Sequence, residues 1–573
     1  MSAGRSRSPG GPGGPGDAVL FAVLAAVALV AVGAWAWGGV AGAVFGDGWP
    51  GVTAGQLAGV LVHLPAHLAN PAAAWPARAR HGLPAAAGFY TALGLLVILT
   101  SGLALGAARL AGRAGLAGRR TGARWAQGGE LGALRGSRGA GPGEGRLVLG
   151  RHHGRLLRAE ARHALVAFGP PQSGKSAGLA VPALLEWDGP AVASSIKTDL
   201  LASTEHRRRG LGSVFVFDPF GLSGAGGHTW SPLRASRTWD GALETAWRLA
   251  AAGELDQKGV EGGDFWAVAA EQRLAPLLYI AAASGLDMDA VVRWTYGQGT
   301  RELDAAIAAL TGSASEPGQL EAAHAAYDAL RAFEAQADRT RTSIEATAQG
   351  LLRAYRFRRV IDSARSCQID PDDLLDGRNT LYLIGDAKAS KLLRPIFLAL
   401  LGEIVDRAYE RATLAGGRLA LPLLLCLDEA GNVAPLPNLA EIASTAPSHN
   451  IQIVSIFHDL AQARSRYGRQ AETVVNSHRA RMLLPGVADL DTLRYFSDLL
   501  GEEEVSESSR TTGAGAGGGT RTSSRRRRPL LAAEALRQLP DRHALLLYGR
   551  LPPAQIALRM WFTDRRLRGL AAP

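Results

Sequence analysis

The feature that most constrains this chain is the octapeptide GPPQSGKS at residues 169–176. It fits the pattern G-x-x-x-x-G-K-[S/T] and lies between an apolar run at 164–168 and a helix-like run at 177–185. A strand, this loop and a helix in succession are the context of a phosphate-binding loop, whose backbone N–H groups surround nucleotide phosphates. The chain is therefore predicted to bind a nucleoside triphosphate. The alternative is a glycine-rich turn with an exposed lysine.

Two side chains of the loop have predicted roles. Lys175 is expected to reach the outer phosphates of ATP, and the Ser176 hydroxyl is expected to bind Mg²⁺. Only five of the 62 Lys and Arg residues are lysines, so a lysine at 175 favours a need for a compact ammonium charge. The predicted nucleotide-binding residues are Gly169, Pro170, Pro171, Gln172, Ser173, Gly174, Lys175 and Ser176.

Net charge and cysteine content place weaker limits on the class of protein. The 573 residues predict several domains, and the formal charge of +11 favours polyanionic partners. Anionic lipid beside a membrane segment explains the basic residues equally well. Cys367 and Cys426 lie far apart with no C-x-x-C pattern, which indicates neither a disulfide framework nor a zinc site.

Two uncharged runs near the start of the chain predict a membrane anchor. Residues 18–37 are long enough to span a bilayer, and a second run covers residues 82–108, with a helix expected over about 84–108. A cleaved signal peptide is the competing interpretation of the first run. Residues 52–75 are uncharged but contain prolines and histidines, which favours an extracytoplasmic or interfacial loop. Residues 1–17 are rich in Gly and Pro and are expected to be disordered.

Basic residues predict the orientation of this anchor in an inner or plasma membrane. Arg109, Arg113, Arg119, Arg120 and Arg124 follow the second run, whereas the loop between the runs holds only Arg78 and Arg80. Cytoplasmic segments carry the excess of basic residues, so the multi-pass anchor should leave the bulk of the chain in the cytoplasm. Residues 109–145 are expected to form a basic linker.

The rest of the chain predicts an α/β fold with an all-α insertion. Strand patterns alternate with helical ones, which is typical of a parallel sheet with ligands at the carboxyl ends of its strands. Residues 240–373 are alanine-rich and helical in period, and they divide a sheet domain into 146–239 and 374–573. Strands are expected at 147–149, 165–168, 191–196, 213–217, 380–384, 421–427 and 451–457, with a terminal pair at 544–548 and 556–560.

An acidic pair completes the predicted catalytic site. Asp428 and Glu429 directly follow the apolar run at 421–427. In a phosphate-loop protein such a pair binds Mg²⁺ through the Asp and activates water through the Glu. The alternative is an ordinary helix N-cap, which the upstream loop makes the weaker interpretation.

Further polar residues at strand ends are weaker candidates. His458 follows the strand at 451–457 and could sense the γ-phosphate if the sheet order is RecA-like; a polar strand cap is the alternative. Arg479 and Arg481 are candidate arginine fingers for a neighbouring subunit. Asp199 and Asp218 also end strands, and capping explains them equally well. Residues 506–528 are rich in Ser, Gly and Arg and are expected to form a flexible loop.

Together these blocks resemble the TraG/TraD family of type IV secretion coupling proteins. The most specific match is DEAGNVAPLPNL at 428–439 followed by HDLAQARSRYG at 458–468. Further blocks in the family's order are SSIKTDLLASTEHRRRG, VFVFDPFG, TWSPL, DFWAVAAEQRLAPLL, RPLLAAEALRQLP and YGRLPPAQI. The resemblance covers about 146–563 and departs at His458, where the family usually has glutamine.

The resemblance implies a RecA-like P-loop domain with an inserted all-α domain and a two-helix membrane anchor. It implies catalytic roles for Lys175 and Glu429, metal binding by Ser176 and Asp428, and ATP and Mg²⁺ as cofactors. His458 is a catalytic candidate from its position at a strand end, not from the resemblance. The implied function is that of a hexameric ATPase which delivers single-stranded DNA with its relaxase, or a protein, to a type IV secretion channel during conjugation. The competing functions are an FtsK-like DNA translocase and a secretion adaptor without motor activity.

Overall fold

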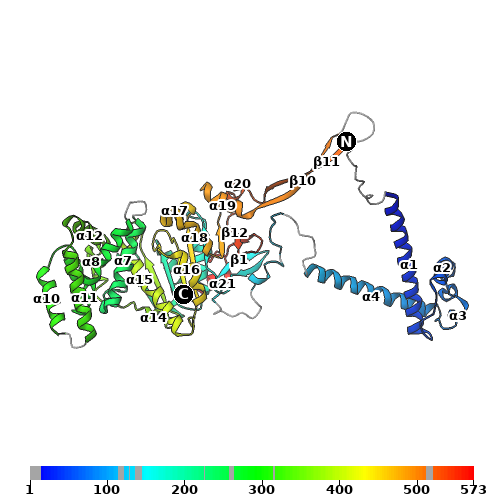
Figure 1. Cartoon of the computed structure of the whole chain (residues 1–573), viewed down its shortest axis with the longest axis horizontal. Coiled ribbons are helices and arrows are strands. Elements are labelled where there is room, and N and C mark those ends of the chain that lie inside the picture. Colours follow the sequence, from blue (N-terminus) through cyan, green and yellow to red (C-terminus); the bar gives the residue numbers. More distant parts are fainter. Residues whose placement is uncertain are drawn as a thin grey trace, which may run out of the picture. The chain divides into compact units, whose positions relative to one another are not determined.

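The structure is a computed structural model that describes residues 15–113, 122–127, 129–135, 145–224, 226–256, 263–313, 317–511 and 520–572. The chain divides into two compact units, Met1–Arg120 and Thr121–Pro573, and both appear in Figure 1. The predictions for residues 1–14 and for most of 114–144 lie outside the described residues. Residues 15–17 begin a helix instead of continuing the predicted N-terminal segment.

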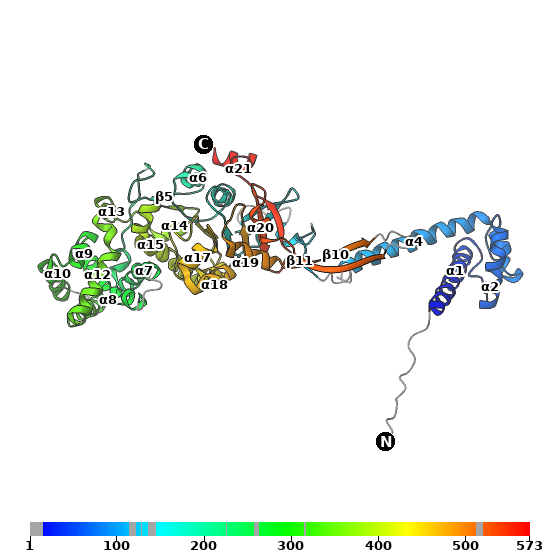
Figure 2. The same cartoon turned by 90° about the horizontal axis from the view of Figure 1, so that it is seen from above.

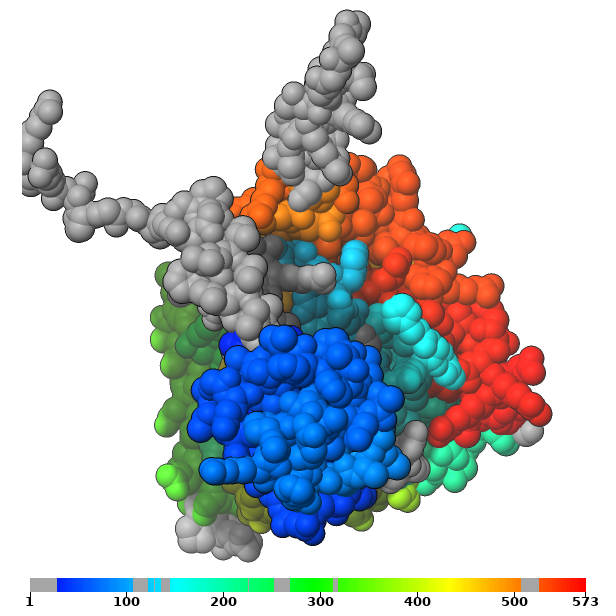
Figure 3. Space-filling model, turned by 90° about the vertical axis from the view of Figure 1, so that its right-hand side faces the viewer, coloured from blue at the N-terminus to red at the C-terminus, as the bar shows by residue number. Residues whose placement is uncertain are grey.

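The first unit consists of two long helices and the short elements between them. The helices are α1 (Pro15–Phe45) and α4 (Ala86–Arg113), and the connection contains α2 (Ala54–His63) and α3 (Ala77–Arg80). The Trp37 indole N–H donates to the Phe89 carbonyl at 2.6 Å, and the buried Trp75 ring lies 5.1 Å from the Phe89 ring. These aromatic contacts hold the two helices together, and Figure 3 shows the unit in blue.

Both long helices contain a segment that is long and apolar enough to cross a membrane. These segments are Ala28–Phe45 and Ala86–Gly106, whereas the sequence predicted spans at 18–37 and about 84–108. Both segments overlap the predicted spans, and α1 continues past Trp37 to Phe45. The prediction of a loop over 52–75 missed α2, whose start is fixed by a capping box in which Thr53 and Gln56 bond each other's backbone.

The second unit contains a mixed sheet whose central part is parallel. Its strands, in spatial order, are β2 (Arg155–Arg158), β1 (Val148–His152), β13 (Ala554–Ala557), β12 (His543–Tyr548), β9 (Ala480–Leu483), β3 (Leu165–Phe168), β8 (Ile451–Phe457), β7 (Leu423–Leu427), β4 (Ala191–Ser195), β6 (Thr380–Ile384) and β5 (Val214–Phe217). The strands from β9 to β5 are parallel, and β12 joins β9 antiparallel. The predicted strands are therefore present.

Helices cover both faces of this sheet, so its strands are buried on both sides. Val166 and Phe168 of β3 belong to one apolar cluster, while Leu165 and Ala167 belong to another. Successive side chains of a strand point to opposite faces, so a continuous apolar run serves both cores. The covering helices are α5 (Val181–Glu186), α6 (Asp199–Arg209), α15 (Ala387–Leu414), α16 (Leu439–Thr445), α17 (Leu460–Tyr467), α18 (Ala471–Ser477), α19 (Leu490–Leu500), α20 (Ala533–Arg537) and α21 (Arg565–Ala571).

Between β5 and β6 the described residues form helices, turns and bends only. The helices are α7 (Trp239–Asp256), α8 (Gly263–Ala283), α9 (Met288–Thr295), α10 (Thr300–Ser313), α11 (Pro317–Glu334), α12 (Asp338–Leu351), α13 (Arg358–Asp362) and α14 (Pro371–Leu375). We call residues 239–375 the helical insertion; it lies at one end of the second unit (Figure 2). It shares its apolar core with the sheet region, so it is packed as part of the same compact unit.

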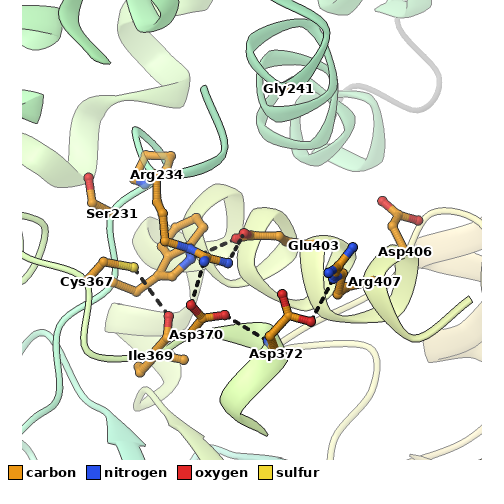
Figure 4. Close-up of polar contacts among 12 residues, drawn as sticks. Ser231, Arg234, Gly241, Cys367, Ile369, Asp370, Asp372, Glu403, Asp406 and Arg407 are labelled. Carbon is orange, nitrogen blue, oxygen red and sulfur yellow. Dashed lines mark hydrogen bonds and ion pairs between the residues drawn. The ribbon is translucent and has the colours of Figure 1, made fainter. Parts of the chain in front are cut away.

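A half-buried polar cluster links the helical insertion to α15 (Figure 4). The Arg234 guanidinium contacts Asp370 at 2.6 Å and Glu403 of α15 at 3.2 Å. A second pair joins Arg407 of α15 to Asp372 at 2.8 Å. Burial raises the pKa of Glu403, and the opposing effect of Arg234 does not cancel it. These charge-assisted contacts set the position of the insertion against the sheet.

The structure corrects the prediction of a flexible loop over 506–528 at residues 506–511 and 520–528, whereas residues 512–519 lie outside the described residues. Strands β10 (Glu502–Thr511) and β11 (Thr520–Pro529) form an antiparallel hairpin that extends from the sheet region (Figure 1). Glu503 faces Arg528 and Glu504 faces Arg527 in its register, so opposite charges lie across from each other. The composition of Ser, Gly and Arg gave no hydrophobic alternation from which these strands could have been predicted.

Candidate nucleotide-binding site

The loop at 169–176 begins where β3 ends and leads into a helical turn. Gln172 and Gly174 have φ values of 65° and 89°, a region that non-glycine residues adopt at a cost. A Cβ on Gly174 would lie 2.5 Å from the end of the flexible Met560 side chain, which can move, so the requirement for glycine comes from its φ. The loop therefore has the tight curvature that a phosphate-binding loop needs.

Lys175 lies inside the curve of the loop. Its ammonium group donates to the Gly169 carbonyl at 2.7 Å, and its side chain is buried. Burial lowers the pKa of Lys175, while the nearby Glu429 and Asp428 carboxylates oppose this shift. The loop thus holds one desolvated cation, which is well suited to bind phosphate oxygens.

Ser176 and Asp428 meet at the carboxyl edge of the sheet. The Ser176 hydroxyl donates to Oδ2 of Asp428 at 2.6 Å. Burial raises the pKa of Asp428 to about 6. Its other oxygen, Oδ1, is buried and has no hydrogen-bond partner among the described residues. A hydroxyl beside a buried, unsatisfied carboxylate oxygen is a donor set that fits a hard divalent cation such as Mg²⁺.

Glu429 is held by two neighbouring side chains. Its carboxylate accepts a hydrogen bond from Asn432 at 2.9 Å and lies 3.4 Å from Nε2 of His458. Burial acts to raise the pKa of Glu429, but the contacts with His458 and Asn432 outweigh it, so the pKa is lowered. The backbone φ of Glu429 is 65°, a strained conformation that is concentrated at functional sites.

The sheet order explains how these residues come together. Strand β8 lies between β3 and β7, with Phe168 aligned to Phe457 and Leu427 to Ser455. The carboxyl ends of the three parallel strands therefore lie side by side, and they present the phosphate loop, His458 and the acidic pair at one edge. A role for His458 as a γ-phosphate sensor was predicted only for a RecA-like strand order, and the sheet has this order. The His458 side chain contacts Glu429.

A cavity of about 920 Å³ lies over this edge. The loop, Lys197, Asp199, Asp428 and Glu429 line it, and its size suits a nucleotide. Sequence reasoning missed a further wall of the cavity that is formed by Arg537, Asp541, Arg542 and Phe562. The Trp561 N–H donates to the Ala177 carbonyl at 3.0 Å, which fixes this wall against the loop. The signal for this wall in the sequence was weak, because Arg537 and Arg542 flank an ordinary turn.

The other candidates fall outside the cavity. The Asp218 carboxylate accepts hydrogen bonds from the backbone of Leu222 and Ser223, which is a structural cap. Arg481 donates to the Val475 and Asn476 carbonyls. Arg479 lies 3.8 Å from Glu160. The role of either arginine as a finger for a neighbouring subunit stays a prediction.

A strand-loop-helix phosphate site, an acidic pair two strands away and an intervening strand that ends at His458 define a RecA-like P-loop nucleotide-binding protein. Within that class, a family model extends the assignment over residues 134–571. The chain belongs to this family, which is described as "Type IV secretory system Conjugative DNA transfer".

Individual relatives agree with the family. The chain is 25% identical to a conjugal transfer protein TraG of Escherichia coli over 67% of this chain and 63% of that protein. It is 22% identical to the protein VirD4 of Rhizobium rhizogenes over 72% of this chain and 60% of that protein. The chain thus spans about three-fifths of the length of these relatives.

Solved structures support the same fold. The bacterial conjugative coupling protein TrwBΔN70 in an unbound form matches with a TM-score of 0.57 at 20% identity, over 77% of this chain and 93% of that one. TrwB in complex with ADP and Mg²⁺ matches with a TM-score of 0.54 at 19% identity, over 77% and 94%. The predicted RecA-like α/β fold is confirmed.

Proposed function

We propose that this chain is a membrane-anchored ATP hydrolase that couples a relaxase–DNA or protein substrate to a type IV secretion channel and drives its translocation. The observation that carries the proposal is the meeting of Lys175, Ser176, Asp428 and Glu429 at one edge of the sheet. Family membership supports conjugation as the process. The TrwB complexes with an ATP analogue and with ADP and Mg²⁺ support ATP and Mg²⁺ as substrate and cofactor.

The residues divide the work of hydrolysis. Lys175 would exchange its contact with Gly169 for the outer phosphates, and Ser176 and Asp428 would hold Mg²⁺. When bound, Mg²⁺ neutralises charge that develops on the phosphates. Glu429 is ionised at neutral pH because its pKa is lowered, so it can accept a proton from the attacking water. His458 would hold Glu429 in place and donate to the γ-phosphate.

Membrane attachment and assembly belong to the same proposal. The segments Ala28–Phe45 and Ala86–Gly106 would span the inner or plasma membrane, with the second unit in the cytoplasm. A homo-hexameric ring would complete each nucleotide site with residues from a neighbour, and Arg479 or Arg481 are the candidates for that role. Its partners would be single-stranded DNA with a relaxase and the proteins of the secretion channel.

The decisive experiment measures ATP hydrolysis by the full chain in lipid nanodiscs, together with transfer in mating assays. Lys175→Ala should lower kcat by about 10²-fold or more, because it removes a charge that stabilises the transition state. Lys175→Arg keeps the charge and tests whether a compact ammonium is needed. Glu429→Gln should abolish hydrolysis while ATP binding remains.

The competing functions give different results. If the full chain bound its partners but hydrolysed no ATP under any condition, a secretion adaptor would replace the motor. If removal of the protein left mating unchanged but disturbed chromosome segregation, an FtsK-like translocase would be favoured. Normal transfer by the Lys175→Ala variant would refute a motor role altogether.

A further inference from the structure

A second cavity, of about 790 Å³, lies outside the nucleotide site and is rich in basic residues. One side is formed by the turn Arg353–Arg356 and Phe357, and the other by the first turns of α15. Arg353, Arg356, Lys388 and Lys391 bring four cationic side chains to it, and all four residues are exposed. We call this cavity the basic groove.

The charges of the basic groove are not neutralised within the described part of the chain. The side chains of Arg353, Lys388 and Lys391 have no hydrogen bond or ion pair with any described residue. Arg356 lies over the Tyr296 ring, with Cζ 5.1 Å from its centroid, a contact that leaves its charge uncompensated. By contrast, many other arginines of the helical insertion pair with carboxylates, as Arg358 does with Asp362.

The carboxylate next to the groove is already engaged. Asp386 precedes α15 and accepts hydrogen bonds from the backbone N–H groups of Lys388 and Ala389 at 2.9 and 2.7 Å. It therefore caps the helix and forms no hydrogen bond or ion pair with the side chain of Lys388 or Lys391. Both lysine side chains remain available to an anionic ligand.

The distribution of lysine in the chain points to the same groove. The chain contains five lysines, and one of them, Lys258, lies outside the described residues. Lys175 and Lys197 line the nucleotide cavity, and Lys388 and Lys391 line the basic groove. In a chain that otherwise uses arginine for its surface cations, the described lysines all lie at these two cavities. An ammonium group binds a phosphate as a flexible point charge.

An exposed aromatic ring narrows the chemistry of the ligand. Phe357 is 46% exposed, and its ring packs edge-to-face against Phe220 at 5.5 Å between centroids. This packing supports the ring while leaving part of it open to the groove. Basic side chains around an exposed aromatic ring are the combination that binds single-stranded nucleic acid, with phosphates on the cations and a base on the ring. An acidic peptide would use the cations but not the ring.

The basic groove is connected to the nucleotide cavity through the sheet. The Gly385 N–H, directly after β6, donates to the Ser195 carbonyl at 3.4 Å, and Ser195 lines the nucleotide cavity. The Ser390 hydroxyl in turn donates to the Gly385 carbonyl at 2.5 Å. The first turn of α15 is thus attached to a strand end at which the nucleotide would bind.

We propose that the basic groove binds a single-stranded nucleic acid, with Lys388 and Lys391 on its phosphodiester backbone and Phe357 against a base. The inference rests on the proposed function, because it assigns the place at which the transported strand contacts the chain. It also states that the basic groove is connected to the nucleotide cavity through Gly385 and Ser195.

The test measures binding of a fluorescent oligothymidylate to the full chain in phosphatidylcholine nanodiscs, over a series of salt concentrations. Each phosphate contact contributes about 0.7 to the slope of log affinity against log salt for single strands. The Lys388→Ala/Lys391→Ala variant should therefore show a slope shallower by about 1.4. Its melting temperature reports whether it is folded.

The matched control removes two other cations from the helical insertion. Arg301 of α10 and Arg339 of α12 are exposed, do not line the basic groove, and have no side-chain partner among the described residues. The Arg301→Ala/Arg339→Ala variant should keep the wild-type slope. An equal change in both double variants would indicate a general charge effect and overturn the assignment of the groove.

The aromatic contact is tested separately with Phe357→Ala. This variant should bind oligothymidylate about fivefold or more weakly, because one stacked base is lost. It should bind an abasic strand of the same length as the wild type does.

Three further results would overturn the inference. In the first, the wild type binds the strand and the lysine variant keeps its slope. In the second, the wild type binds ATP but no strand at any salt concentration. In the third, polyglutamate displaces the strand and Phe357→Ala has no effect, which would indicate an acidic protein ligand. Failure of the proposed function would give a different result, which is an absence of ATP hydrolysis by the wild type.

Discussion

The Ser176 hydroxyl donates to the Asp428 carboxylate at 2.6 Å, although 252 residues separate them in the sequence. Ser176 follows the loop after β3 and Asp428 directly follows β7, and these two strands lie on either side of β8. In the sequence, the entire helical insertion therefore lies between the two residues that we propose as Mg²⁺ ligands, although these residues are adjacent in space. This arrangement makes the site sensitive to the protonation of a single buried carboxyl.

Metal binding is expected to depend on the proton of Asp428. Burial raises the pKa of Asp428 to about 6, so below that pH the carboxyl is protonated and cannot serve as a ligand. The apparent affinity of the full chain for Mg²⁺, measured by calorimetry with a non-hydrolysable ATP analogue, should fall about tenfold per pH unit below 6. Above pH 6 it should level off, once Mg²⁺ binding to the free nucleotide is subtracted.

The sign of the accompanying stability change follows from the same pKa. The folded chain holds this proton more tightly than the unfolded chain does, so the metal-free protein should lose stability as the pH rises from about 4 to 6. Asp428→Asn removes the titrating group and should abolish this dependence of the melting temperature. A Mg²⁺ affinity that continued to rise at the same rate up to pH 8 would contradict the assignment of Asp428 as the carboxyl whose proton controls Mg²⁺ binding.

The contact between His458 and Glu429 is expected to set the pH of the acid limb in the pH profile of kcat. His458 helps to lower the pKa of Glu429, so His458→Ala should raise that pKa and move the acid limb of kcat to higher pH. His458→Gln keeps a hydrogen-bond donor and should stay closer to the wild type.

A matched control for this experiment is His449→Ala, because His449 lies on the turn Ala446–His449 and its ring contacts Thr445 and Tyr409, not Glu429. Its pH profile of kcat should follow the wild type. If the profile of His458→Ala also followed the wild type, His458 would be a simple strand cap.

The phosphate loop and the acidic pair could be predicted because each is a local pattern at the end of an apolar run. The runs before Gly169 and Asp428 are buried on both faces of the sheet, which leaves a continuous apolar signal. The strand order then follows from the class of fold, and it places His458 between them.

The remaining parts of the site depend on contacts that have no local signal. Phe562 and Arg542 reach the nucleotide cavity because β13 pairs with β12 and the following segment returns to Ala177. In the hairpin of β10 and β11, an acidic run faces a basic run, and Arg528 contacts Glu503 at 2.8 Å. That charge complementarity was visible in the sequence, but low-complexity composition outweighed it.

Arg481 is expected to act on stability. Its guanidinium donates to the Val475 and Asn476 carbonyls at 3.1 and 3.2 Å, so Arg481→Ala leaves both without this partner. Each lost hydrogen bond costs about 1 kcal/mol, and the melting temperature of the full chain should fall by a few degrees. If kcat fell by about 10³-fold instead, with an unchanged melting temperature, Arg481 would be an arginine finger.

The orientation of the membrane anchor can be tested with single cysteines. Asn70 lies between the two candidate spans and is exposed, whereas Arg301 is exposed on α10 in the second unit. In a background with Cys367→Ser and Cys426→Ala, a membrane-impermeant maleimide added to intact spheroplasts should label Asn70→Cys and not Arg301→Cys. After lysis both should be labelled, which controls for accessibility. The basic residues that follow the second span are expected to stay in the cytoplasm. Labelling of Arg301→Cys in intact spheroplasts would therefore indicate the opposite topology, in which the second unit has no access to cytoplasmic ATP.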